Sequence, residues 1–312
     1  MSYKLLIFGA SMFKRMFLFV LLNALVVLSV MTILNLLHVQ PYLSAYGLNL
    51  QSLMIFCLVW GFAGSFISLF LSKPMAKWMM KVKTINPLTT NENEKNILFM
   101  VESLCRKAGL VDLPEIGIYS SNQINAFATG RSQKNSLIAL SSSLIENLSE
   151  KEVEGVIAHE ISHIANGDMV TMTLLQGVVN AFVLFLSRVL AFLIMNMSKE
   201  RDRRPSYGNF YLTTYLFEII FMLFGQLIVM GYSRKREYRA DASAAQIAGK
   251  QAMLQALRAL ARIQNPSYKN QNKSIAAFQI SGKSKKGFMH LFASHPTLED
   301  RIYQLETNTL YY

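Results

Sequence analysis

Four long apolar stretches constrain this chain more than any other feature of its sequence. They run from 16 to 37, from 53 to 71, from 174 to 197 and from 212 to 231. A helix needs about 20 apolar residues to cross the hydrocarbon core of a bilayer, so each stretch is long enough to span one. Hydrophobic residues make up 52% of the chain and charged residues only 16%, a balance typical of a membrane protein that also has a soluble portion.

Basic residues around the first two stretches set the expected orientation. Lysines and arginines precede the first stretch and follow the second, whereas the link from 38 to 52 contains neither. The positive-inside rule therefore predicts that the N-terminus and the segment after residue 72 lie in the cytoplasm, with the first stretch kept as an anchor. The net charge is +12, but the basic residues cluster beside apolar segments and form no aromatic–basic stripe. An anionic bilayer surface is thus the expected partner, and nucleic acid is not.

The third and fourth stretches each contain one charged residue. Arg188 lies in the third and Glu218 in the fourth, while the loop between them, 199–204, is mostly basic. A charge in the middle of a bilayer costs at least about 2.5 kcal/mol, so each is expected to have a partner. The two residues lie at similar distances from the loop, and we predict that they pair. A hairpin that is only partly embedded in lipid is the alternative.

The segment 158–163 carries the chemistry of the chain. His159 and His163 are four residues apart with Glu160 between them, in the pattern H-E-x-x-H. On a helix both imidazoles project from one face and can bind one zinc ion, while Glu160 is placed to act as a general base. The alternative is an amphipathic helix whose histidines only satisfy polar neighbours.

The flanking residues favour a helix over 150–166. Ser149 and Glu152 form a capping box, and Gly167 is a natural stop. Further elements are expected around it. They are a helix over 91–109, strands over 115–119, 124–129 and 136–141, a helix over 233–263, and a basic loop over 265–286.

A catalytic zinc site needs a third protein ligand, and the best donor follows the fourth apolar stretch. Glu237 and Asp241 share one helical face at i and i+4. We take Glu237 as the ligand and Asp241 as a group that orients a ligand histidine. The alternative for Asp241 is a surface salt bridge with Arg236 or Arg239. His159 precedes the third and fourth apolar stretches, and Glu237 follows them. The two residues can meet only if the chain between them crosses the membrane twice or not at all.

Several motifs together resemble the HtpX family of membrane-embedded zinc endopeptidases. They are the H-E-x-x-H segment continuing to Gly167-Asp168, Glu237 followed by Ala240-Asp241, Asn125-Ala126-Phe127-Ala128, and Ser294-His295-Pro296. The resemblance covers nearly the whole chain. It implies an α-helical membrane protein with four apolar helices and an α+β zincin domain of the gluzincin type. It also implies one Zn²⁺ per chain held by His159, His163 and Glu237, with Glu160 in catalysis.

The resemblance further implies where and on what the protein acts. The expected location is the bacterial inner membrane, with several spans and the peptidase domain in the cytoplasm. The expected substrates are unfolded or damaged membrane proteins, degraded in quality control and stress response. The expected domains are helix pairs at 1–72 and 174–231, and two parts of the zincin domain at 73–173 and 232–312.

Two further sets of site residues are expected. His295 is a candidate for stabilising the transition state, because the resemblance brings it toward the site; the alternative is that it caps the helix starting at Thr297. The strand with Asn125, Ala126 and Phe127 precedes the site helix and resembles the substrate-binding strand of the family. It is therefore expected to be a sheet edge that binds an extended peptide by strand addition.

Two other functions remain open at this point. A CAAX-type prenyl-protein peptidase uses a similar metal site, but such a protein is expected to have more than four spanning helices. A non-catalytic membrane scaffold with a zinc-containing domain would have no need for Glu160. Structural zinc also prefers four protein ligands and thiolates.

Overall fold

The computed structural model describes residues 32, 36, 43–44, 47–197, 207–264 and 293–307. Of the first predicted apolar stretch, only Thr32 and Leu36 fall within this part of the chain. The predicted loops at 199–204 and 265–286 lie outside it. The chain divides into two compact units, one made of 1–68 with 174–225 and the other of 69–173 with 226–312.

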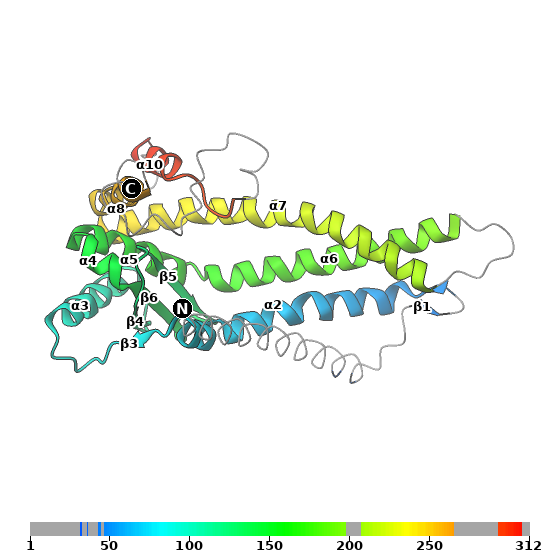
Figure 1. Cartoon of the computed structure of the whole chain (residues 1–312), viewed down its shortest axis with the longest axis horizontal. Coiled ribbons are helices and arrows are strands. Elements are labelled where there is room, and N and C mark those ends of the chain that lie inside the picture. Colours follow the sequence, from blue (N-terminus) through cyan, green and yellow to red (C-terminus); the bar gives the residue numbers. More distant parts are fainter. Residues whose placement is uncertain are drawn as a thin grey trace, which may run out of the picture. The chain divides into compact units, whose positions relative to one another are not determined.

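Three long helices contain the other apolar stretches. They are α2 (Leu50–Met80), α6 (Asp168–Met197) and α7 (Tyr207–Ala248), shown in Figure 1. Each is long and apolar enough to cross a membrane. Each helix is longer than the apolar stretch that it contains, because it continues into polar residues beyond at least one end of that stretch.

Small residues let the apolar helices approach one another closely within the first unit. A Cβ atom built on Gly61 of α2 would lie 2.5 Å from the backbone nitrogen of Ala181 in α6. One built on Gly177 of α6 would lie 2.4 Å from the ring of Phe62. Helices in lipid associate by such close packing, because the surrounding acyl chains give no hydrophobic drive for helix association. The first unit also contains a hairpin of two short strands, β1 (Leu43–Ser44) and β2 (Gly47–Leu48).

The predicted charge pair between the third and fourth apolar stretches is confirmed. Arg188 Nη1 of α6 donates to Glu218 Oε1 of α7 at 2.7 Å. The guanidinium also lies 5.3 Å from the centroid of the Phe56 ring on α2. The pair therefore neutralises both charges within the apolar helices and joins all three of them.

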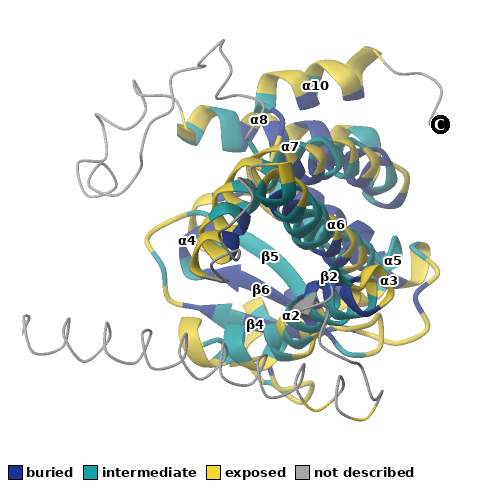
Figure 2. Ribbon diagram, turned by 90° about the vertical axis from the view of Figure 1, so that its right-hand side faces the viewer, coloured by how far each residue is buried: buried dark blue, intermediate teal, exposed yellow. Residues whose placement is uncertain are grey.

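The second unit contains a four-stranded sheet in the order β3-β4-β6-β5. Its strands are β3 (Lys83–Thr84), β4 (Glu115–Tyr119), β5 (Ala126–Gly130) and β6 (Ser136–Ser141). Strands β4 and β6 are parallel, and the other two pairs are antiparallel. In Figure 2, β6 is buried throughout and β5 is only partly covered, as expected for a central strand and an edge strand.

Helices cover this sheet and form the core of the unit. They include α3 (Glu92–Lys107), α4 (Ser142–Asn147) and α5 (Glu150–Ala165). The capping box of α5 is present, with the Ser149 backbone N–H donating to Glu152 Oε2 at 2.8 Å. The apolar side of α5 is fully buried, as the sequence predicts, at Ile157, Ile161 and Ile164.

The prediction of one helix over 233–263 is wrong. Helix α7 runs without interruption from the apolar stretch to Ala248, and α8 (Lys250–Gln264) is a separate helix. Gly249 separates them with φ of +93°, a conformation that residues with a Cβ rarely adopt. Helix α8 then packs against α5 where Gly155 leaves no room for a side chain, since a Cβ there would lie 2.5 Å from the Ala252 carbonyl oxygen. The last described helix is α10 (Leu298–Thr307).

Candidate metal centre

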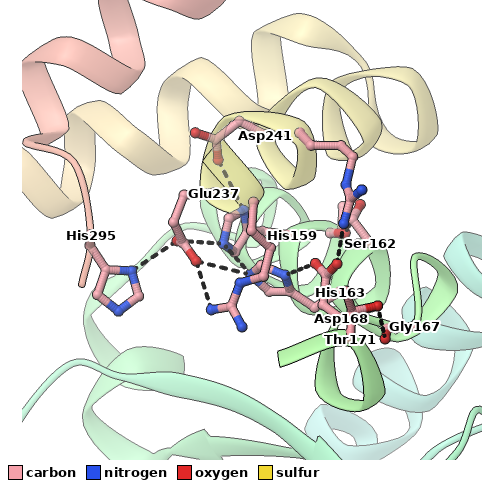
Figure 3. Close-up of polar contacts among 12 residues, drawn as sticks. His159, Ser162, His163, Gly167, Asp168, Thr171, Glu237, Asp241 and His295 are labelled. Carbon is pink, nitrogen blue, oxygen red and sulfur yellow. Dashed lines mark hydrogen bonds and ion pairs between the residues drawn. The ribbon is translucent and has the colours of Figure 1, made fainter. Parts of the chain in front are cut away.

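The two histidines of helix α5 face each other across one helical turn. Their ring centroids are 4.6 Å apart and their planes nearly perpendicular. The Nε2 atoms of His159 and His163 are 3.1 Å apart, and each residue is only 8% exposed. The i, i+4 spacing and the capped helix thus bring two ring nitrogens to one point, as Figure 3 shows.

Glu237 of helix α7 reaches the same point. Its Oε2 lies 3.5 Å from His159 Nε2, and its Oε1 lies 3.5 Å from His163 Nε2. The side chain is almost fully buried. One donor atom from each of the three residues lies within 4.8 Å of the other two, and this is the only such group of three found in the described part of the chain.

The second nitrogen of each imidazole contacts a buried carboxylate. His159 Nδ1 lies 2.9 Å from Asp241 Oδ1, and His163 Nδ1 lies 2.7 Å from Asp168 Oδ2. In the neutral form of each ring, which a metal ion requires, Nδ1–H donates to a carboxylate and Nε2 keeps a lone pair. Two lone pairs and a carboxylate that converge in this way repel one another unless a cation lies between them.

The distances between these donor atoms fit a divalent metal ion. Zn–N bonds of about 2.0–2.1 Å in a tetrahedral site place ligand atoms about 3.3 Å apart. The three separations here are 3.1, 3.5 and 3.5 Å. Two imidazole nitrogens and one carboxylate, with each imidazole held by a further carboxylate, form a donor set common in catalytic metal sites.

Electrostatics around the three residues favour a cation at the same point. Burial and the nearby Arg301 lower the pKa of His159, but the hydrogen bonds to Asp241 and Glu237 outweigh them and raise this pKa to about 9. Burial raises the pKa of Glu237, but the imidazoles of His159 and His295 hold it far below its usual range. The centre thus stabilises a positive charge on the His159 imidazole and a negative charge on Glu237.

Asp241 lies in a buried ion pair. Its carboxylate accepts from Arg301 Nε at 2.8 Å and from Arg301 Nη2 at 2.6 Å, while it also contacts His159. The alternative of a surface salt bridge with Arg236 or Arg239 is wrong, because Asp241 is only 2% exposed and those arginines pair elsewhere.

Sequence reasoning missed Arg301. It lies four residues before the buried Leu305 on amphipathic α10, so it belongs to the apolar face. A charge on such a face indicates a buried partner. That signal was available in the sequence, but the identity of the partner was not.

His295 contacts the candidate metal ligand and does not cap a helix. Its Nδ1 lies 2.9 Å from Glu237 Oε2, although more than half of its side chain is exposed. The N-terminus of α10 is capped by Thr297, whose hydroxyl accepts from the Asp300 N–H at 3.1 Å. The capping alternative for His295 is therefore wrong, and its ring is available at the exposed side of the centre.

Glu160 lies next to the first histidine and is partly exposed. Within the described residues its carboxylate makes no hydrogen bond or ion pair with another side chain, in contrast to Glu237, Asp241 and Asp168. Its charge raises the pKa of Tyr119 on β4, where burial is the larger cause. An unengaged carboxylate beside a candidate metal ligand is suited to accept a proton.

Strand β5 lies at the edge of the sheet. The Asn125 carbonyl accepts from the Ser141 N–H of β6 at 3.0 Å, and the Asn125 N–H donates to the Ser141 hydroxyl at 3.0 Å. Backbone groups alternate in direction along a strand, so those of Ala126 and Ala128 point away from β6, and those of Phe127 point toward it. Strand β5 contacts helix α5, which carries the two histidines.

Apolar spanning helices, an edge strand beside a capped H-E-x-x-H helix, and a buried group of two histidines and a glutamate together define a membrane metalloprotease. Comparison with known proteins identifies the family. Residues 91–309 match peptidase family M48, and the chain belongs to this family as an HtpX-type protease.

Curated relatives match almost over their full lengths. A Protease HtpX homolog of Methylacidiphilum infernorum is 44% identical over 95% of this chain and 99% of its own. One from Bacillus subtilis is 43% identical, with the same coverage. Protease HtpX of Alcanivorax borkumensis is 45% identical over 94% of this chain and 98% of its own. The non-catalytic scaffold is therefore wrong.

The fold is also similar to a solved structure. The crystal structure of S. mikatae Ste24p superposes with a TM-score of 0.59 at 21% sequence identity. The match covers 96% of this chain and 65% of Ste24p. The two proteins thus share a fold, while the present chain corresponds to about two thirds of the longer one.

Proposed function

We propose that the chain is a zinc endopeptidase in which His159, His163 and Glu237 hold one Zn²⁺ and Glu160 moves the proton. The observation that carries the proposal is the convergence of two imidazole lone pairs and one carboxylate, with the far side of each ring fixed by a buried carboxylate. A zinc ion bound there acts as a Lewis acid on the peptide carbonyl and makes water more acidic.

The chain's own residues supply the remaining steps. Glu160 accepts a proton from the attacking water on its carboxylate and then delivers it to the nitrogen of the departing amine. Asp241 keeps the Nδ1 proton of His159 in place, so that Nε2 faces the ion. His295 lies on the exposed side of Glu237, and its Nδ1–H, which faces Glu237 Oε2 at 2.9 Å, is proposed to turn to the oxyanion that develops on the carbonyl.

Substrate binding is proposed at the free edge of the segment that contains Asn125, Ala126 and Phe127, where the outward backbone groups of Ala126 and Ala128 would pair with the peptide. A peptide added to this edge is held in an extended form by backbone hydrogen bonds, with little dependence on side chains. Only an unfolded segment can present its backbone in this way. This supports unfolded or damaged membrane proteins as substrates, in quality control and stress response.

We also propose the placement of the protein in the cell. The membrane is the bacterial inner membrane, and the metal centre faces the cytoplasm, as the positive-inside rule predicts. Helix pairs at 1–72 and 174–231 form the membrane part, and 73–173 with 232–312 form the peptidase domain. The division of the chain into units of 1–68 with 174–225 and 69–173 with 226–312 supports these bounds.

The test is metal analysis of the full-length protein purified in detergent, combined with a casein cleavage assay. We expect one zinc per chain, loss of cleavage on chelation, and recovery on addition of zinc. Glu237→Ala should lose the metal, while the exposed control Asp112→Asn should keep it. Unchanged cleavage after complete removal of the metal would contradict the proposal. Preference for a prenylated CAAX peptide over casein would instead favour the prenyl-protein peptidase.

A further inference from the structure

Asp168, which follows the H-E-x-x-H segment in the motif Gly167-Asp168, contacts the centre although it is not one of the three candidate ligands. Helix α5 ends at Ala165 with Asn166 as its C-cap, and after Gly167 helix α6 begins with Asp168. Gly167 has φ of +66°, in the left-handed region that favours glycine. The chain turns sharply there, so that the side chain of Asp168 returns to the ring of His163 (Figure 3).

Both oxygens of the Asp168 carboxylate are engaged. Oδ2 accepts from His163 Nδ1 at 2.7 Å, and Oδ1 pairs with Arg239 Nη2. Asp168 is 1% exposed, whereas about half of the Arg239 side chain is exposed. A carboxylate this deeply buried is stable only when it is paired, and here the arginine and the imidazole provide the partners.

The same arrangement occurs at the other histidine. His159 contacts Asp241, and Asp241 is held by Arg301, so each imidazole has a carboxylate and each carboxylate has an arginine. Both pairs connect the histidine helix to α7, since Asp241 lies on α7 itself and the pair at His163 reaches α7 through Arg239. Arg239 lies two residues beyond Glu237 on α7, and therefore the Asp168–Arg239 pair joins the α5–α6 turn directly to the helix that carries the third candidate ligand.

We propose that Asp168 is a positioning residue that, together with Arg239, holds His163 with Nε2 toward the metal and increases its affinity for the ion; the inference rests on the proposed function. The carboxylate fixes the tautomer and the orientation of the His163 ring. Arg239 pairs with that carboxylate from α7 and holds Glu237 at the correct distance from the two rings.

The test measures zinc affinity in the full-length protein, with a chromophoric chelator as competitor, in a Glu160→Gln background that cannot cleave itself. Asp168→Asn keeps the size of the side chain and removes its charge. We expect it to weaken zinc binding about 10- to 100-fold. Arg239→Gln should weaken binding in the same direction by a smaller factor. In the double variant the two factors should not multiply, because both changes disrupt one contact. Asp112→Asn is the exposed control and should bind zinc as the wild type does.

A spectroscopic readout separates positioning from a general structural role. The visible absorption of the Co²⁺-substituted protein reports the ligand field, and we expect it to change in Asp168→Asn and Arg239→Gln but not in Asp112→Asn. Zinc affinities within twofold of the wild type and unchanged cobalt spectra in both variants would overturn the inference. If Asp168→Asn does not fold, the half-exposed Arg239→Gln decides alone. A failure of the proposed function is distinguishable, because His163→Ala would then keep the zinc.

Discussion

The acidic residues of the metal centre fall into two kinds, those in buried ion pairs and one that is partly exposed. Glu160 differs from the other acidic residues of the centre, because its carboxylate is partly exposed and makes no hydrogen bond or ion pair with another described side chain. Glu237, Asp241 and Asp168 are each almost fully buried and paired. The carboxylate available for proton transfer is thus separate from those that build the site.

Glu160→Gln tests this separation. We expect proteolysis to fall by about a hundredfold to ten-thousandfold, because the amide cannot accept the proton. Zinc content should be unchanged, because Glu160 is not one of the three candidate ligands. The measurement is casein cleavage together with metal analysis. Glu154→Gln on the same helix, whose carboxylate pairs with Lys151, is the matched control and should retain activity. Full proteolysis in Glu160→Gln would show that another group accepts the proton.

Removal of the metal should make the stability of the protein depend on pH. The pKa of His159 is about 9 in the fold, above its ordinary value of 6.5, so the folded chain binds this proton more tightly than the unfolded chain. The contribution to stability is complete below pH 6.5 and is lost as the pH rises through 9. Chelated protein should therefore show a decreasing melting temperature over this range. The same decrease in His159→Gln would mean that another group is responsible.

At the scale of single residues, the sequence predicts which side chains come together but not the groups that hold them in place. The i, i+4 spacing of the histidines and the face shared by Glu237 and Asp241 are local, and the structure brings these residues together. The supporting contacts are distant in sequence: Arg239 pairs with Asp168 across 71 positions, and Arg301 pairs with Asp241 across 60. Only the fold determines such contacts, so their roles could not be deduced from spacing.

Strand β5, which contacts the histidine-bearing helix α5, has a free edge at which a peptide is proposed to bind. The Ala126 N–H points away from β6, so Ala126→Pro removes one outward donor and leaves the hydrogen bonds between Asn125 and Ser141 intact. We expect cleavage of casein to be strongly reduced, with unchanged zinc content. Unaltered turnover would refute the assignment of β5 as the substrate strand.

The paired charges on α6 and α7 are a second test at this scale. Arg188→Glu or Glu218→Arg alone places two like charges among apolar helices, where one unpaired charge costs at least about 2.5 kcal/mol. We expect each single reversal to reduce the yield of folded protein, and the double swap to recover most of it. Single variants that fold no worse than the double swap would show that the contact does not stabilise the helices.

Element boundaries were predicted where local signals exist. Strands 115–119 and 136–141 and the capped helix α5 agree with the sequence prediction, because turn residues and caps mark their ends. The join between the last apolar stretch and the following helix was missed. No residue near 231 to 233 interrupts α7, whereas Gly249 does interrupt the helix predicted through it. Near residue 231 only the hydropathy changes, and the helix continues. At Gly249 the backbone conformation changes, and the helix ends.

For the whole molecule, the open question is which side of the membrane the metal centre faces. Asp112 is exposed, whereas Cys57 and Cys105 are buried and burial raises the pKa of the Cys105 thiol to about 11. A cysteine introduced at Asp112 is therefore expected to be the reactive thiol within the described residues. It should react with an impermeant maleimide in inside-out vesicles and not in intact cells. Labelling of intact cells would place the centre outside the cytoplasm, and the unsubstituted protein is the control.

The two edge strands of the sheet, β3 and β5, differ in a way that limits the association of one copy of the protein with another. At one end, β3 is only two residues long, includes Lys83, and offers too little backbone for another chain to extend. At the other end, β5 is longer and carries two alanines with outward-facing backbone groups. Short, charged edges discourage aggregation between copies of a protein. If the protease binds unfolded polypeptide at β5, as proposed, the sheet then has one edge that is open to a substrate strand, and copies of the protein cannot join edge to edge into a continuous sheet.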